Sequence, residues 1–120
     1  MSGMFDEVFQ RLERALPGFR AAAVVGSDGI EIESWVRSEL PHEVLGAELN
    51  GLLRNLDRLQ SEIGIGALEE MTIRTTEENI LMLRLSPELF ILAITEAAQP
   101  TGKARYEIKR LAHTFMAQLA

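Results

Sequence analysis

The chain has 120 residues, of which 47% are hydrophobic and 25% charged, with a formal net charge of −6 and no cysteine. This length and composition are typical of one soluble globular domain, here covering residues 1–120. The acidic balance disfavours nucleic acid as a partner, the apolar runs are too short for membrane insertion, and the lack of cysteine excludes disulfides and thiolate catalysis.

The N-terminal part predicts one helix followed by two strands. The helix has Ser2 as a candidate cap and ends at residues 17–18; it lacks the basic and apolar regions of a signal peptide, so we expect a cytoplasmic location. Residues 20–25 are apolar on both faces, which is typical of a central strand. After a turn at residues 26–29, residues 30–36 alternate and predict a half-exposed edge strand.

Residues 42–63 predict the longest helix. Six apolar residues recur in it at spacings of three and four and form one seam, which we expect to face the core: Leu45, Leu49, Leu52, Leu56, Leu59 and Ile63. Three small residues, Gly46, Ala47 and Gly51, lie off this seam. They are either neutral surface positions or the contact for a second protein or a second copy of this one.

The remaining chain predicts three strands and a last helix. Residues 70–75 alternate, with Met71 and Ile73 on one side, and predict a second edge strand. Residues 80–85 form a strand with one charged residue, and residues 89–95 are apolar on both faces, as in a central strand. Thr101 is a candidate cap for the last helix, whose predicted buried side chains are Ile108, Leu111, Ala112, Phe115 and Leu119.

This order of elements predicts an α/β fold with a three-layer α/β/α sandwich. The two strands that are apolar on both faces belong inside the sheet, and the two alternating strands belong at its edges. Short hairpins then give a five-stranded antiparallel sheet in the order 2-1-5-4-3. The long helix covers one face, and the N- and C-terminal helices cover the other.

The residues show no catalytic, metal-binding or cofactor-binding pattern, so we expect a protein that is not an enzyme. His42 and His113 lie about seventy positions apart, which disfavours a shared zinc or hydrolytic site. Glu31 and Glu33 share one face of an alternating strand, and we interpret them as solvated edge charges. Trp35 has the same parity; it is either an exposed contact residue or covered by a neighbouring element.

Two local stretches carry a family resemblance. Residues 22–30 (AAVVGSDGI) resemble the first hairpin of the Roadblock family, with its Asp-Gly turn. Residues 100–106 (PTGKARY) resemble that family's glycine-led entry to the last helix. Together with the seamed second helix and the five strands, they make the whole chain similar to the dynein light-chain and bacterial MglB-type members of this family.

The resemblance implies a homodimer. In the family, the third strand pairs with its two-fold mate, and the second helices lie side by side. The interface residues that this arrangement implies here are Gly46, Asn50, Leu53, Met71, Thr72, Ile73, Arg74 and Thr75.

The resemblance also implies a partner. Bacterial members of the family bind small Ras-like GTPases through the paired helices and regulate hydrolysis without a nucleotide site of their own. The candidate residues for that surface are Ala47, Gly51, Arg54 and Arg58. A trans-acting arginine is one mechanism, although the resemblance favours scaffolding of the GTPase's own residues. A purely structural dimerisation module and a small-ligand sensor are the alternatives.

Overall fold

The computed structural model describes residues 3–37 and 41–119, with three helices and five strands in this part of the chain. Their order is α1 (Asp6–Ala15), β1 (Phe19–Gly26), β2 (Glu31–Val36), α2 (His42–Ile63), β3 (Glu70–Arg74), β4 (Glu78–Ser86), β5 (Leu89–Glu96) and α3 (Thr101–Leu119). The expected cap Ser2 and the side chains of Phe115 and Leu119 lie outside what is described.

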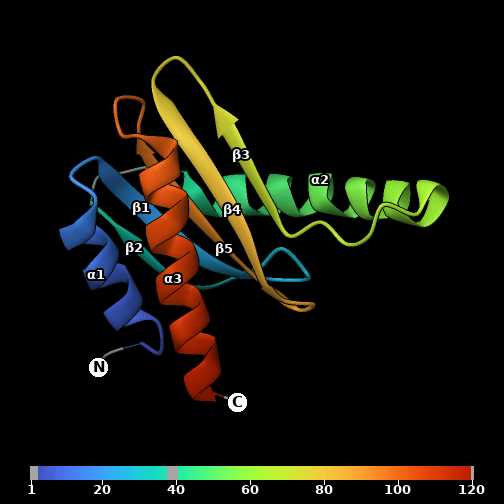
Figure 1. Ribbon diagram of the computed structural model, residues 1–120, viewed down its shortest axis with the longest axis horizontal. Coiled ribbons are helices and arrows are strands. Elements are labelled where there is room, and N and C mark those ends of the chain that lie inside the picture. The colour runs from blue at the N-terminus through green and yellow to red at the C-terminus, as the bar shows by residue number, and fades with distance from the viewer. Residues whose placement is uncertain (1–2, 38–40, 120) are drawn as a thin grey trace.

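The strands form one antiparallel sheet in the order β2-β1-β5-β4-β3, which confirms the predicted topology. Figure 1 shows α1 and α3 on one face of the sheet and α2 on the other, with the C-terminal part of α2 extending sideways beyond the strands. The predicted three-layer sandwich is therefore confirmed, but its two outer layers differ in extent.

Two apolar clusters hold these layers together, one on each face of the sheet. Side chains of α1 and α3 pack with Ala22 and Val24 on one face, whereas α2 packs with Ala23 and Val25 on the other. Because successive strand residues point to opposite faces, β1 is buried on both sides. The central positions of β1 and β5 follow from this two-sided burial, as their continuous apolar runs predict.

A β-bulge interrupts the alternation of β2. Val24 pairs with Glu33, but the next residue, Val25, pairs with Glu31. One extra residue on β2 reverses which face the following side chains occupy. Glu31 therefore lies on the α2 side, where it contacts His42. The expectation that Glu31 and Glu33 share a face is wrong for this reason.

Glu33 lies on the other face and holds the start of α1. Its carboxylate oxygens accept hydrogen bonds from the backbone N–H groups of Met4 and Phe5 at 2.6 and 2.7 Å. Met4 and Phe5 directly precede α1, whose first turn has no side-chain cap, so this carboxylate fixes the segment that leads into the helix. A Cβ atom on Gly3 would lie 2.7 Å from a carboxylate oxygen of Glu33, so a larger residue there would displace this carboxylate.

Trp35 is half-buried and packs against residues of its own chain. Its ring stacks on the buried Phe19 ring, with a centroid separation of 5.1 Å and an interplanar angle of 17°. The Arg37 guanidinium lies 5.7 Å from the Trp35 ring centre, a cation–π distance. These contacts favour a structural role for Trp35 at the outer strand over an exposed contact role.

A buried polar cluster ties the two loops at Gly18 and Gln99 to β4 and β5. The Asn79 side-chain amide lies 3.0 Å from the Gln99 carbonyl, 3.2 Å from the Glu96 carbonyl and 3.3 Å from the Thr95 hydroxyl. The Gln99 side chain in turn accepts the Gly18 N–H at 2.9 Å. Asn79 and Thr95 are fully buried, so these hydrogen bonds satisfy the amide N–H groups of Asn79 where water does not reach, whereas Asn79 Oδ1 has no hydrogen-bond partner among the described residues.

We predict that Asn79→Ala lowers the free energy of unfolding by about 1–3 kcal/mol, because it leaves buried carbonyl oxygens without their donor. Urea denaturation followed by circular dichroism measures the change. The matched control is Asn55→Ala on the exposed side of α2, for which we expect a change below about 0.5 kcal/mol. Equal losses in the two variants would contradict a structural role for the cluster.

Candidate functional site

The side of α2 that faces the sheet is built from small and polar residues as well as leucines. Its buried residues are Gly46, Leu49, Asn50 and Leu53. A Cβ atom on Gly46 would lie 3.2 Å from a Val25 methyl group, so the helix approaches β1 closely at this point. Gly46, Asn50 and Leu53 were predicted to contact a second helix. This prediction is corrected, because their own sheet already covers them.

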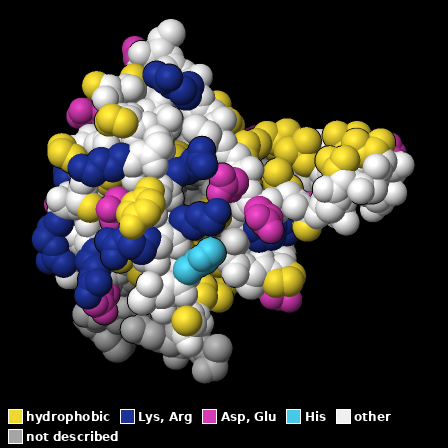
Figure 2. Space-filling model, in the orientation of Figure 1, with side chains coloured by type: hydrophobic (Ala, Val, Ile, Leu, Met, Phe, Trp, Pro, Cys, Tyr) yellow, Lys and Arg dark blue, Asp and Glu magenta, His cyan; other side chains and the backbone are white. Residues whose placement is uncertain are grey.

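The leucine seam lies on one flank of α2, beside the sheet-facing side. Leu49 is buried and Leu45 and Leu56 are half-buried, but Leu52, Leu59 and Ile63 are 39%, 44% and 62% exposed. The prediction that the whole seam faces the core is therefore wrong. Figure 2 shows hydrophobic side chains along the arm that α2 extends beyond the body of the molecule. We call Leu45, Leu52, Leu56, Leu59 and Ile63 the leucine flank.

The β3 edge borders this flank. Within the described residues β3 pairs with β4 alone, so its outer backbone groups have no strand partner there. Met71 and Ile73 are half-buried and pack, like Leu45, against the cluster between α2 and the sheet, whereas Thr72 and Arg74 are exposed. The predicted alternation of β3 is thus confirmed. An open strand edge and an uncovered apolar helix flank together form a surface suited to another protein chain.

The four predicted partner-binding residues all lie exposed on α2. Gly51 has open space around it, and the Arg58 guanidinium donates to the Asn55 side chain three residues earlier. The Arg54 guanidinium donates to the Ser27 carbonyl at 2.8 Å. Ala47, Gly51, Arg54 and Arg58 therefore remain available at the surface, with Arg54 held in a fixed position.

Ser27 belongs to the tight turn between β1 and β2. In this turn the Asp28 carboxylate accepts the Ile30 N–H at 2.9 Å, and Gly29 has a φ of 81°, a left-handed conformation that favours glycine. The Asn50 amide also donates to the Ser27 carbonyl, at 3.2 Å. The Asp-Gly turn thus anchors the middle of α2 through two side chains.

Arg84 is a further anchor that the sequence pattern did not identify. It lies on β4, pairs with Asp57 of α2 at 3.3 Å and donates to the Leu68 carbonyl at 3.0 Å. A cleft of about 290 Å³ beside this pair is lined by Arg54, Asp57, Arg84 and Glu88 among others. Its two cations and two carboxylates balance, so it presents no net charge that would select an anion or a cation.

No helix among the described residues combines the length and apolar character that crossing a membrane requires.

Comparisons with known proteins agree with this geometry. The family model for the Roadblock/LC7 domain matches residues 4–95. The uncharacterized Methanocaldococcus jannaschii protein MJ0714 is 30% identical over 112 residues, covering 93% of each chain. A second uncharacterized protein of that organism, MJ1340, is 30% identical over 114 residues, covering 95% of this chain and 98% of its own.

Solved structures share the fold at lower sequence identity. The gliding protein MglB of Thermus thermophilus superposes with a TM-score of 0.83 at 16% identity, covering 100% of this chain and 96% of its own. An MglB structure described as having a tetrameric arrangement gives 0.84 at 14% identity, with coverages of 98% and 90%. Myxococcus xanthus MglC gives 0.67 at 23% identity, with coverages of 97% and 99%. The family model matches residues 4–95, which is most of this chain, and the solved MglB structures share its fold. The chain therefore belongs to the Roadblock/LC7 domain family.

Proposed function

We propose that this protein is a homodimeric, non-catalytic regulator of a small Ras-like GTPase. The observation that carries the proposal is the uncovered leucine flank of α2 beside the open edge of β3. Exposed apolar surface of this kind on a soluble protein marks a contact with another chain. The Roadblock resemblance suggests that this other chain is a second copy of the protein. It also suggests that the resulting pair binds a small Ras-like GTPase.

In the proposed dimer, β3 pairs with β3 of the second copy through Met71, Thr72, Ile73, Arg74 and Thr75. The two α2 helices then meet through the leucine flank and not through Gly46, Asn50 and Leu53, which their own sheet covers. Transferring Leu52, Leu59 and Ile63 from water to such a contact would contribute several kcal/mol in total, at about 25 cal/mol per Å² of apolar surface.

The outer surface of the paired helices is the proposed GTPase-binding surface. It carries Ala47, Gly51, Arg54 and Arg58, all exposed. Ala47 and Gly51 are small enough for a partner's backbone to approach, and Arg54 and Arg58 offer donors to acidic or carbonyl groups. Because Arg54 is already bonded to Ser27, its role is better explained by binding than by insertion into a nucleotide site. The protein would act by positioning residues of the GTPase itself.

We predict that Leu59→Glu shifts the protein from dimer to monomer, because it places a charge in the contact between the two helices. Light scattering at micromolar concentration should then give a mass near 13.4 kDa, against twice this value for the unsubstituted protein. Val44→Glu is the matched control: Val44 is 63% exposed on the same helix but lies outside the leucine flank. A Leu59→Glu dimer as tight as the control would exclude this interface.

The β3 edge is tested separately. We predict that Ile73→Lys also weakens the dimer, since Ile73 is half-buried next to the proposed joint sheet. Thr72→Lys adds the same charge on the opposite face of β3, where the side chain is exposed, and should retain more of the dimer. Circular dichroism checks that both variants are folded. Sedimentation showing equal dissociation constants for both would remove the apolar face of β3 from the interface.

For the partner, we predict that Arg54→Ala keeps the dimer but weakens GTPase binding by about tenfold. Calorimetry with a small Ras-like GTPase encoded near this protein, loaded with a non-hydrolysable GTP analogue, measures the affinity. Arg14→Ala, an exposed arginine of α1, is the control. Unaltered affinity in Arg54→Ala would place the partner-binding surface elsewhere. Hydrolysis rates measured with and without the protein separate a regulator from an adaptor, because binding with unchanged hydrolysis supports the adaptor.

A further inference from the structure

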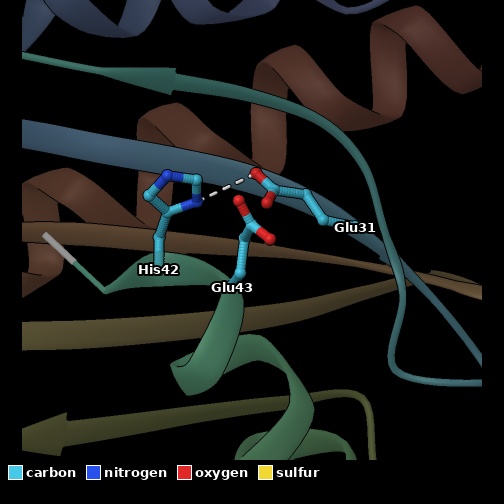
Figure 3. Close-up of side chains that lie close together, drawn as sticks. All are labelled: Glu31, His42 and Glu43. Atoms are coloured by element: carbon cyan, nitrogen blue, oxygen red, sulfur yellow. Dashed lines mark ion pairs between the residues drawn. The ribbon is translucent and has the colours of Figure 1, made fainter.

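Three potential metal ligands converge where β2 passes the N-terminus of α2, at the opposite end of this helix from Leu59 and Ile63. They are Glu31, His42 and Glu43, and one ligand atom from each lies within 4.8 Å of the other two. Figure 3 shows the imidazole and the two carboxylates turned toward one another. We propose that these residues bind a divalent transition-metal ion, with Zn²⁺ as the ion that fits the donor set best.

The fold brings these residues together by two separate features. The bulge in β2 turns Glu31 toward the α2 side of the sheet. His42 and Glu43 are the first two residues of α2, so their backbone is held by the helix and their side chains leave it about 100° apart. The site therefore has one ligand from a strand and two from a helix start, which are rigid supports for a metal centre.

The environment of the first two ligands is the main evidence. His42 Nδ1 and Glu31 Oε1 lie 2.9 Å apart, and their side chains are only 17% and 15% exposed. Both atoms are buried, and the contact between them is an ion pair that lacks the angles of a hydrogen bond. Buried polar atoms usually have hydrogen bonds of good geometry, and these two have none among the described residues. A cation coordinated by both atoms would use the lone pairs that this contact leaves poorly directed.

The spacing is near that of a metal site. With Zn–N and Zn–O bonds of roughly 2.0–2.2 Å, tetrahedral ligand atoms lie about 3.3–3.6 Å apart. His42 Nδ1 and Glu31 Oε1 are 2.9 Å apart, so the two side chains would separate by about 0.5 Å to admit the ion. Glu43 is exposed, so rotation of its side chain can bring its carboxylate in by about 1.5 Å from the present limit of 4.8 Å. A water molecule would complete four-coordination.

Charge and donor type restrict the ion. Two carboxylates and a neutral imidazole give the site a charge of about −2, which matches a divalent cation and outweighs the partial positive charge at the helix N-terminus. Imidazole with carboxylate suits zinc and its transition-metal neighbours, whereas magnesium and calcium prefer oxygen ligands alone. A bound ion would connect β2 to the start of α2 and stabilise the folded state by mass action.

The test is a Zn²⁺ titration of the tag-free protein after dialysis against a chelator and then into chelator-free buffer. We expect calorimetry to show one Zn²⁺ per chain and the melting temperature to rise with added Zn²⁺. His42→Gln and Glu31→Gln should each weaken binding by at least about tenfold, and Glu43→Gln by less. His113→Gln, which changes an exposed histidine on α3, is the matched control and should bind as the unsubstituted protein does.

Co²⁺ provides a readout that does not depend on how the buried variants fold. In the unsubstituted protein, Co²⁺ should give the intense visible absorption of a four-coordinate site and lose it on addition of Zn²⁺. Absorption like that of aqueous Co²⁺, unchanged Zn²⁺ affinity in all three ligand variants, or loss of binding in His113→Gln alone would each overturn the proposal. An ordinary histidine–glutamate ion pair would then be the correct description, with no consequence for the proposed dimer.

Discussion

The close approach of α2 to β1 at Gly46 is the constraint on which the rest of this structure depends. A side chain larger than hydrogen at this position would press on Val25, so the helix lies on the sheet with its small residue inward. This orientation is fixed at mid-helix by the bonds from Asn50 and Arg54 to the Ser27 carbonyl and by the Asp57–Arg84 pair. Because Gly46, Leu49 and Leu53 occupy the sheet-facing side, the other leucines are displaced to a flank that this chain leaves uncovered.

The two faces of the sheet are therefore unequal. One face is covered by α1 and α3, and its cluster contains fully buried rings and leucines such as Phe9 and Leu12. The other face is covered by α2 alone, and Met71, Ile73 and Ile80 at its β3 end are only half-buried. An edge strand whose apolar side chains are half-covered is open to pairing. The unequal coverage explains why one region combines the open strand edge and the uncovered helix flank.

The strand order and most element positions could be predicted from the sequence because they depend on hydrophobic period and turn residues. The rotation of α2 could not, because a hydrophobic seam marks a buried face without distinguishing the chain's own core from a contact with another chain. Gly46 indicates that another part of the structure approaches α2 closely, but the sequence does not show whether this is its own sheet or a second helix. The bulge in β2 adds a residue without altering composition, so the faces of Glu31 and Glu33 were assigned wrongly. The Glu31–His42 contact depends on that bulge, and counting histidines along the sequence did not reveal it.

The end of α2 gives an independent physical reason to expect a partner. None of the residues 54–63 is fully buried, although this stretch includes Leu56, Leu59 and Ile63. Short helices without tertiary packing are marginally stable in water, and most helical stability in proteins comes from burying an apolar face. Within the chain, the C-terminal capping of this stretch comes from Gly64, which has a φ of 66° and whose N–H donates to the Gln60 carbonyl. Such a cap contributes far less than burial of three large apolar side chains. This segment is therefore expected to be helical when its apolar flank packs against a second apolar surface. The adjoining β3 edge favours a second copy of the same chain as that surface.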